Sequence, residues 1–383
     1  MGDLDKSVAQ QGKVIPFRSR RRERRLLIVF LVLLAVVAVG ALLLAGGGKN
    51  YDALRRAVSY REETRVQLES SGERIAKSYC GGLAVLDGAG LGIYDKSGAL
   101  LNLTATPMET PALRTAGKYA LSFDAGGKTL ELYQSGKGVQ LSLEAEGSVF
   151  DADVSEGGYM AYVCAGGNAK AMLHVYNSSF ELSYTVYSAT RHLTGCAVSS
   201  GGHYAAAVGL GQKDHVFDST AIVYATNKKD PIAEVSLGNQ LIYDIYFMDN
   251  KTLCAIGQSS AVFFDVSGRI LGTYQYASLL DYDVCAGAVV LELGAAQGGS
   301  ADVVTVGSAG QELGRISVTG AVYGISASGK YTAVLTDSGL FLYDKKLALW
   351  SQTQETAGAS GLAMCEDGSV FLLAGQVAWR YLP

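Results

Sequence analysis

The chain has 383 residues, a formal net charge of −4 and six cysteines, and its length is sufficient for a large hydrophobic core. The cysteines lie about 30–85 residues apart and form no Cys-x-x-Cys pair, which excludes a small disulfide-rich domain, a zinc ribbon and thioredoxin-like chemistry. They sit in apolar runs, so we expect them to behave as buried small hydrophobic residues.

The first strong feature is the segment 26–45, LLIVFLVLLAVVAVGALLLA, which contains no charged residue. A helix rises about 1.5 Å per residue, so this segment would span roughly 30 Å, the thickness of the hydrocarbon core of a bilayer. We therefore predict a single transmembrane helix that serves as a signal anchor. A cleavable signal peptide is the alternative, but its apolar core is usually about 7–15 residues long.

The charges on either side of this segment predict its orientation. Residues 1–25 contain eight Lys or Arg and three acidic residues, a net charge of +5, and the rest of the chain carries −9. By the positive-inside rule, residues 1–25 form a cytoplasmic basic tail and the C-terminal part is extracytoplasmic, so we expect a single-pass cell-membrane protein. Residues 46–63 follow as a juxtamembrane linker or stalk.

From residue 64 to residue 383 the hydrophobic pattern alternates with a period of two, which is typical of β-strands. An internal repeat recurs about every 40 residues. One half of the unit is a Ser-x-x-Gly turn followed by Tyr-x-Ala, as in VSEGGYMAY, VSSGGHYAAAV and ISASGKYTAVL. The other half is a second hairpin, as in LGIYDKSGALLNL and AVFFDVSGRILGTY. Two hairpins per unit predict a four-stranded blade.

These units predict an all-β fold, a β-propeller of eight four-stranded blades, with seven blades as the alternative. The eight predicted blades are 74–104, 109–145, 148–188, 192–238, 241–275, 280–318, 321–353 and 359–383. The last unit has only three strands, and the segment 64–70 has no partner in its own unit. We expect this segment to complete the last blade, so that the two ends of the domain pair and close the ring. A pair of β-sandwiches is the competing fold.

Tyrosines recur at one strand position of the repeat, where we expect them to pack between blades. They are Tyr94, Tyr133, Tyr176, Tyr224 and Tyr343.

Aspartates form the one constellation that could carry chemistry. Aligned on the Ser-x-x-Gly turn, Asp151, Asp244 and Asp281 fall at one equivalent position, and Asp153 and Asp283 lie two residues further on. The strands concerned are the first strands of blades three, five and six, which are the innermost in a propeller. Carboxylates around one channel mouth could hold a divalent metal ion or a basic peptide. Alternatively, each Asp accepts hydrogen bonds from loop amides between blades.

The sequence contains no GxSxG, HExxH or GxxxxGK[ST] motif and no calcium-binding loop. We therefore expect no catalytic residues and no cofactor, and we expect the basic tail to mark membrane topology rather than nucleic-acid binding. The leading hypothesis is a non-enzymatic scaffold that binds a protein, peptide or glycan at the cell envelope. The alternative is a metal-assisted hydrolase or lyase with its site at the channel mouth, around Asp151, Asp244 and Asp281.

The basic tail, single span, short stalk and degenerate repeats with YDKSG, FDVSG and YDKKL turns resemble a family of membrane-anchored propeller proteins of Gram-positive, mostly clostridial bacteria, catalogued as domain of unknown function 5711. The resemblance implies the propeller fold and membrane anchoring, and it assigns no activity. In architecture the chain is also similar to eight-bladed quinoprotein-type propellers. The regular tryptophan motif of those proteins is absent here, since the chain has two Trp, so the resemblance implies no quinone cofactor.

Overall fold

The computed structural model describes residues 64–68, 74–213, 215–228, 230–294, 300–356 and 358–383. The predicted tail, transmembrane helix and stalk lie outside these residues. Within them the chain is all strand and turn, and no helix is long and apolar enough to cross a membrane.

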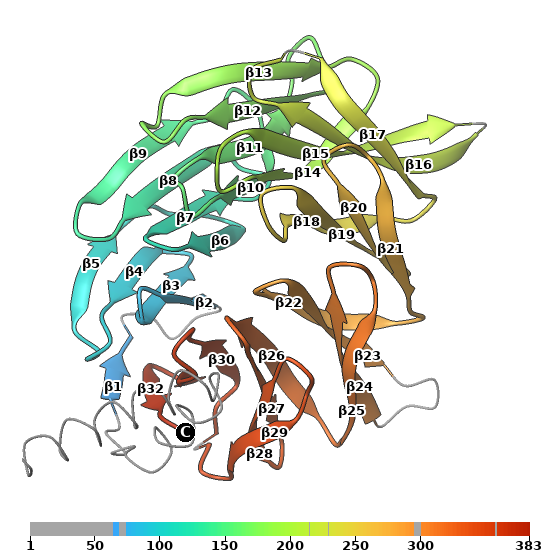
Figure 1. Ribbon diagram of the computed structural model, residues 1–383. Helices are drawn as coiled ribbons and strands as arrows, with labels where there is room; N and C mark the ends of the chain where they lie inside the picture. Colours follow the sequence, from blue (N-terminus) through green and yellow to red (C-terminus); the bar gives the residue numbers. More distant parts are fainter. Residues whose placement is uncertain (1–63, 69–73, 214, 229, 295–299, 357) are drawn as a thin grey trace, which may run out of the picture. The chain divides into compact units, whose positions relative to one another are not determined.

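The described strands form eight antiparallel four-stranded sheets, which confirms the eight-bladed propeller rather than seven blades or a pair of sandwiches (Figure 1). Blade one contains β2 (Arg74–Tyr79), β3 (Gly82–Asp87), β4 (Gly90–Tyr94) and β5 (Leu100–Thr104). Blade two contains β6 (Pro111–Ala116), β7 (Tyr119–Asp124), β8 (Thr129–Gln134) and β9 (Gly138–Glu144). Blade three contains β10 (Val149–Val154), β11 (Met160–Ala165), β12 (Ala171–Tyr176) and β13 (Leu182–Ser188). Blade four contains β14 (His192–Val198), β15 (Tyr204–Lys213), β16 (Val216–Ala225) and β17 (Pro231–Gly238).

The second half of the propeller repeats the same order. Blade five contains β18 (Ile242–Phe247), β19 (Thr252–Gly257), β20 (Ser260–Asp265) and β21 (Ile270–Gln275). Blade six contains β22 (Leu279–Cys285), β23 (Ala288–Gly294), β24 (Ser300–Gly307) and β25 (Glu312–Thr319). Blade seven contains β26 (Val322–Ser328), β27 (Tyr331–Thr336), β28 (Gly339–Asp344) and β29 (Leu349–Thr353).

Blade eight is assembled from both ends of the described chain. It contains β30 (Gly361–Met364), β31 (Val370–Ala374), β32 (Val377–Tyr381) and, paired antiparallel with β32, the strand β1 (Thr64–Gln67). The outer strand of this sheet therefore comes from the segment that the repeat left without a partner.

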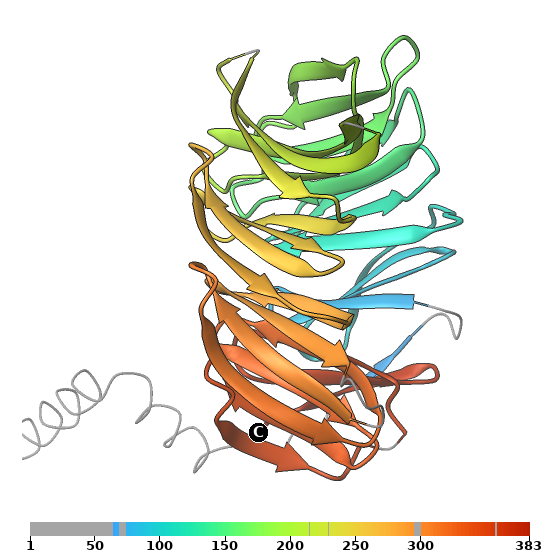
Figure 2. The same ribbon diagram turned by 90° about the vertical axis from the view of Figure 1, so that its right-hand side faces the viewer.

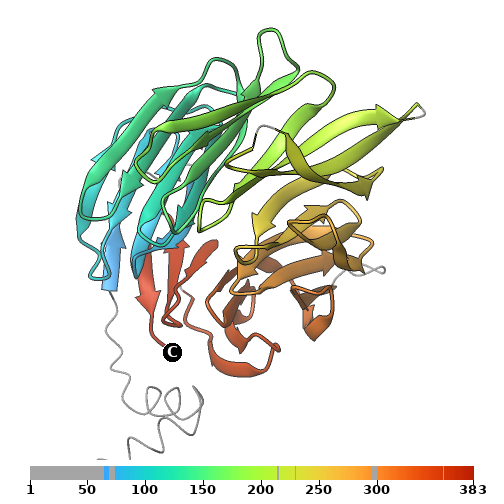
Figure 3. The same cartoon turned by 45° about the horizontal axis from the view of Figure 1, so that its top comes forward.

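The core lies between the blades, which stack face to face (Figures 2 and 3). The two middle strands of each blade are mostly buried on both faces, so small and branched residues dominate them. In blade four, for example, Ala205, Ala206 and Ala207 are fully buried, and they pack alternately against the neighbouring blades on the two sides. The repeated tyrosines pack into these interfaces as predicted, Tyr94, Tyr133 and Tyr224 almost completely buried and Tyr176 and Tyr343 partly so.

The innermost strand begins with a β-bulge in blades three to seven. The register of the ladder shifts once in each of these strands, between Val149 and Asp151 in β10 and at the equivalent points of β14, β18, β22 and β26. A bulge inserts one extra residue and turns its side chain away from the ladder. Each of these strands therefore starts with one side chain directed differently from the rest.

The innermost strands of neighbouring blades are unequally spaced. Among the described strands, β10 and β14, β14 and β18, β22 and β26, and β26 and β30 lie in close contact, whereas β18 and β22 lie farther apart (Figure 1). Blades five and six still share a core farther from the centre, which includes Phe263 and Leu291. The wider spacing affects the inner ends of these two blades, where three of the predicted aspartates lie.

Candidate functional site at the centre of the propeller

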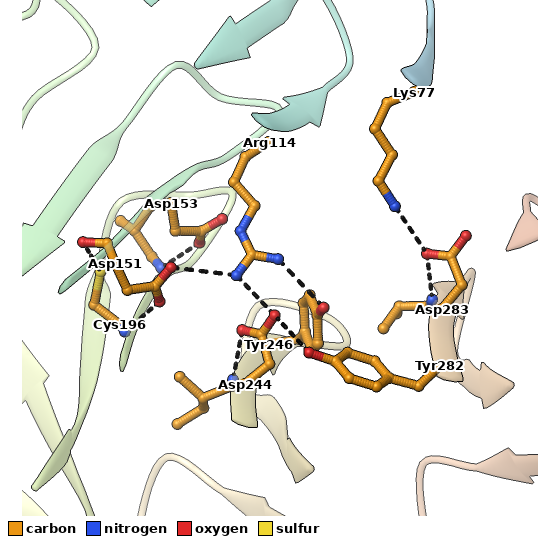
Figure 4. Close-up of polar contacts among 12 residues, drawn as sticks. Lys77, Arg114, Asp151, Asp153, Cys196, Asp244, Tyr246, Tyr282 and Asp283 are labelled. Atoms are coloured by element: carbon orange, nitrogen blue, oxygen red, sulfur yellow. Dashed lines mark hydrogen bonds and ion pairs between the residues drawn. The ribbon is translucent and has the colours of Figure 1, made fainter. Parts of the chain in front are cut away.

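The structure places all five predicted aspartates on innermost strands. Asp151 and Asp153 lie on β10, Asp244 on β18 and Asp283 on β22 (Figure 4). Asp281 also lies on β22. Asp151, Asp244 and Asp281 each directly follow the bulged residue of their strand. The repeat alignment therefore predicted equivalent positions correctly.

Three of the carboxylates connect a blade to the next one. Asp151 accepts a hydrogen bond from the Cys196 amide at 2.9 Å, and Asp153 accepts one from the Val198 amide at 2.9 Å. In the same way Asp283 on β22 accepts a hydrogen bond from the Ala327 amide on β26 at 2.8 Å. The donors belong to the innermost strands of the following blades and not to loops, which corrects the expected donor. These aspartates satisfy strand amides that have no ladder partner on that side.

Asp244 has a different partner. β22 is too far from β18 to offer an amide, and the Asp244 carboxylate instead meets the Arg114 guanidinium from β6 of blade two, with Nη2 2.7 Å from Oδ2. The same Nη2 lies 3.3 Å from Oδ1 of Asp151. Arg114 Nη1 also donates to the Tyr246 hydroxyl at 3.3 Å, and the Tyr282 hydroxyl donates to Asp244 at 3.4 Å. Arg114 thus links blades two, three and five through the centre (Figure 4).

A second ion pair also joins blades that are not neighbours. Lys77 Nζ on β2 of blade one lies 3.6 Å from Oδ1 of Asp283 in blade six (Figure 4). The Lys77 side chain is 42% exposed, so this pair contributes little to stability. It nevertheless places a second positive charge beside the carboxylates.

Burial governs the protonation of this cluster. It raises the pKa of Asp151 to about 6 against the opposing effect of Arg114, and it raises the pKa of Asp153 to about 7. Burial disfavours the charged form of Arg114, but Asp244, Tyr246 and Asp151 raise its pKa well above the ordinary value. The guanidinium therefore stays charged while two nearby carboxyl groups titrate close to neutral pH.

The metal-site hypothesis requires Asp151, Asp244 and Asp281 to face one shared position. Arg114 lies between the first two, and Asp281 accepts a hydrogen bond from the Tyr282 amide at 2.8 Å. No group of three His, Cys, Asp or Glu side chains suited to a metal ion occurs in the described part of the chain. The cation that neutralises Asp151 and Asp244 is the chain's own guanidinium.

Sequence reasoning missed Arg114, Lys77 and the tyrosines that complete this cluster. A pattern in the sequence could have indicated the two cations. In blades one and two the innermost strands, RIAKSY and PALRTA, carry a Lys or Arg, where blades three, five and six carry aspartates. Opposite charges on the innermost strands of one propeller predict ion pairs through its centre.

The cysteines are all free thiols. Cys164, Cys196, Cys254, Cys285 and Cys365 are buried, as their apolar surroundings indicated, whereas Cys80 is exposed at the turn between β2 and β3.

Comparison with solved structures shows the propeller fold. The crystal structure of the C-terminal WD40 domain of Sif2 is similar, with a TM-score of 0.57 and 13% sequence identity, over 83% of this chain and 99% of that one. At this identity the likeness concerns the fold alone. A search of curated proteins gave no match.

Comparison with family models gives the relationship at the level of sequence. The model of a family of unknown function, DUF5711, matches residues 53–346, which is most of the chain and includes the first six blades. The match also spans the strands that carry Arg114, Asp151 and Asp244. The chain therefore belongs to the family of unknown function DUF5711.

Proposed function

We propose that this protein is a non-enzymatic binding scaffold of the cell envelope. Residues 26–45 anchor it in the cell membrane, the basic tail lies in the cytoplasm, and the propeller is displayed on the extracytoplasmic side to bind a protein, peptide or glycan. Propellers commonly serve as binding scaffolds, and the similarity to a WD40 domain supports this class of function.

One observation carries the proposal: the carboxylates best placed for catalysis already have partners within the chain. Asp151, Asp153 and Asp283 accept hydrogen bonds from backbone amides of neighbouring blades. Asp244 forms an ion pair with Arg114. A general acid or base must reach a substrate proton, and a metal site needs several ligands that face one position. These aspartates favour a rigid ring, which suits a binding module.

The pairing of β1 with β32 supports a further part of the proposal, that the ring is closed by strands from its two ends. A closed ring would keep its loops at fixed positions, because no blade could separate without breaking strand pairing. Rigid presentation of loops lowers the entropic cost of binding.

Membrane topology can be tested with Cys80, because it is the exposed cysteine of the propeller while the other five are buried. A membrane-impermeant maleimide should label Cys80 in intact cells, and Cys80→Ser should abolish the labelling. In a matched variant that combines Cys80→Ser with Ser7→Cys, labelling should require permeabilised cells. Labelling of Cys80 only after permeabilisation would refute the proposed topology.

Binding can be tested by cross-linking the full-length protein in membranes and identifying what it captures. The matched variant carries Asp151→Asn, Asp244→Asn and Asp281→Asn. If both proteins capture the same envelope component, the scaffold proposal stands and these aspartates are structural. If nothing is captured and the variant loses a bound metal ion without unfolding, the enzyme hypothesis replaces it.

A further inference from the structure

Four exposed apolar side chains occupy one equivalent position in four blades. Each is the extra residue of the bulge that begins an innermost strand, and each is between 43% and 59% exposed. These residues, which we call the central rim, are Phe150 on β10, Tyr243 on β18, Leu280 on β22 and Tyr323 on β26. Single exposed apolar residues are common on proteins, but recurrence at one bulge position is not explained by chance exposure.

The bulges account for this exposure. In a regular strand the alternation would send successive side chains into the interfaces on the two sides of the blade, whereas the bulge frees the extra residue from the ladder. Full burial of Phe150 or Tyr243 would contribute to the core, yet both remain about half exposed. The fold therefore keeps apolar side chains out of its core at the beginning of these strands.

Blade four contributes apolar surface to the same face by another route. Its bulged residue is Thr194, but its middle hairpin is unusually long. β15 pairs with β14 only as far as Leu210 and then continues past the beginning of β14, so the tip of the hairpin projects on the side of the central rim. Val216 and Phe217 near this tip are exposed, and Arg191 pairs with Asp218 at 3.0 Å beside them.

Negative charge lies directly behind the rim. Asp151, Asp244 and Asp281 are the residues that follow Phe150, Tyr243 and Leu280. The aspartates of β10, β18 and β22 outnumber Arg114 and Lys77, the two cations that contact them. A ligand that enters from the rim therefore meets excess carboxylate.

One further carboxyl group in this region has no hydrogen-bond or ion-pair partner among the residues that the structure describes. Glu292 on β23 is opposite Asp281 in the ladder and is only 7% exposed, and no hydrogen bond or ion pair joins it to another residue described by the structure. The equivalent positions of blades three, four, five and seven are buried and apolar: Val163, Val208, Ile256 and Leu335. Two acidic side chains at opposite positions of the ladder repel each other when both are charged, and a cation would complement the Asp281 and Glu292 pair.

We propose that the face bearing the central rim binds an extended segment of a partner polypeptide. Apolar side chains of the segment pack on the rim, and a lysine or arginine side chain is directed to Asp281 and Glu292. The inference rests on the proposed scaffold function and assigns its binding face and the chemistry of its partner. The apolar rim and the excess carboxylate behind it together favour a ligand that is both apolar and basic.

The test uses the full-length protein in phosphatidylcholine nanodiscs and three fluorescein-labelled nonapeptides. The first is Gly-Ser-Phe-Lys-Leu-Lys-Phe-Ser-Gly; the second has glutamate in place of both lysines, and the third has serine in place of the phenylalanines and leucine. Fluorescence anisotropy should show saturable binding of the first peptide and at least tenfold weaker binding of the other two. Empty nanodiscs should bind none of them.

Matched variants locate the binding face. The double variant Tyr243→Ser with Tyr323→Ser should weaken binding of the first peptide at least tenfold. Tyr187→Ser is the control, because Tyr187 is 68% exposed but lies on the outer strand β13, and it should leave binding unchanged. Asp281→Asn with Glu292→Gln should reduce the preference for lysine over glutamate. A cooperative thermal unfolding transition shows that each variant is folded.

Two results would overturn the inference: no saturable binding of the first peptide to the wild-type protein, or equal binding to the wild-type protein and the rim double variant. Cross-linking of the same variants in membranes separates this outcome from failure of the scaffold function. A partner captured equally by wild type and rim variant refutes the binding face and leaves the scaffold. If a second copy of this chain is the captured species, the face is a self-association surface and the basic-peptide proposal fails.

Discussion

Asp153 on β10 and Asp244 on β18 are both aspartates of innermost strands, but they hold the propeller together in different ways. Asp153 accepts a hydrogen bond from the adjacent blade, at the Val198 amide. Asp244 pairs with a guanidinium that comes from blade two, on the opposite side of the centre. The difference follows from spacing, because β14 lies close to β10 while β22 lies away from β18. One residue type at related positions therefore acts as an amide acceptor or as a counter-ion, according to the distance of the next strand.

Removal of the Arg114 guanidinium should have the largest effect on stability, because it eliminates the ion pair with Asp244 across the centre. Arg114→Leu leaves the carboxylate of Asp244, which is 4% exposed, without its cation. Loss of one partner of a buried pair is strongly destabilising, so we expect the free energy of unfolding to fall by about 2–4 kcal/mol in urea titrations at pH 8. Adding Asp244→Asn should recover part of the loss. Wild-type stability of the single variant would contradict the assigned role.

Removal of the Asp153 carboxylate eliminates the hydrogen bond between adjacent blades. Asp153→Ala leaves the Val198 amide without its carboxylate acceptor, and an unsatisfied buried donor costs about 1–3 kcal/mol. Asp153→Asn keeps an acceptor oxygen and should retain wild-type stability or exceed it at pH 8, where it also removes a charge that burial disfavours. Equal losses for both substitutions would show that charge, and not the hydrogen bond, matters at this position.

Glu292 sharpens the comparison because, among the described residues, neither an amide nor a cation contacts its carboxyl group. Burial first, and then the charge of Asp281, raise its pKa to about 7 from an ordinary value of 4.5. The folded state then binds a proton more tightly than the unfolded state, so Glu292 lowers stability as the pH rises from about 4.5 to 7. Glu292→Gln should therefore stabilise the protein by about 1–2 kcal/mol at pH 8 and have no such effect at pH 4. A gain that is independent of pH would mean that Glu292 is not ionised in the folded protein.

The smallest expected effect concerns the hydroxyl that contacts Arg114. Tyr246→Phe removes a 3.3 Å hydrogen bond and keeps the ring, which stacks edge-on against Tyr282. Because the bond is long and the ion pair with Asp244 remains, the free energy of unfolding should fall by less than about 1 kcal/mol. A larger loss in the same urea titrations would show that the tyrosine, and not the carboxylate, fixes the position of Arg114.

The strand order and blade boundaries could be predicted from the sequence because they depend on local pattern. Alternation with a period of two identifies strands, Ser-x-x-Gly turns identify hairpins, and repetition every 40 residues or so identifies blades. The same alignment placed Asp151, Asp244 and Asp281 at one strand position. These features need only neighbours along the chain, so the sequence determines them without knowledge of distant contacts.

What each aspartate does was decided by the tertiary structure. Arg114 and Asp244 are 130 positions apart in the chain and meet because both strands that carry them line the centre of the ring. The unequal spacing of β18 and β22 depends on how whole blades pack, and the bulges that expose Phe150 and Tyr243 depend on the register between paired strands. Packing and register are set by many residues at once. A repeat motif can therefore specify where an aspartate lies on its strand, while the assembled ring determines which partner it meets.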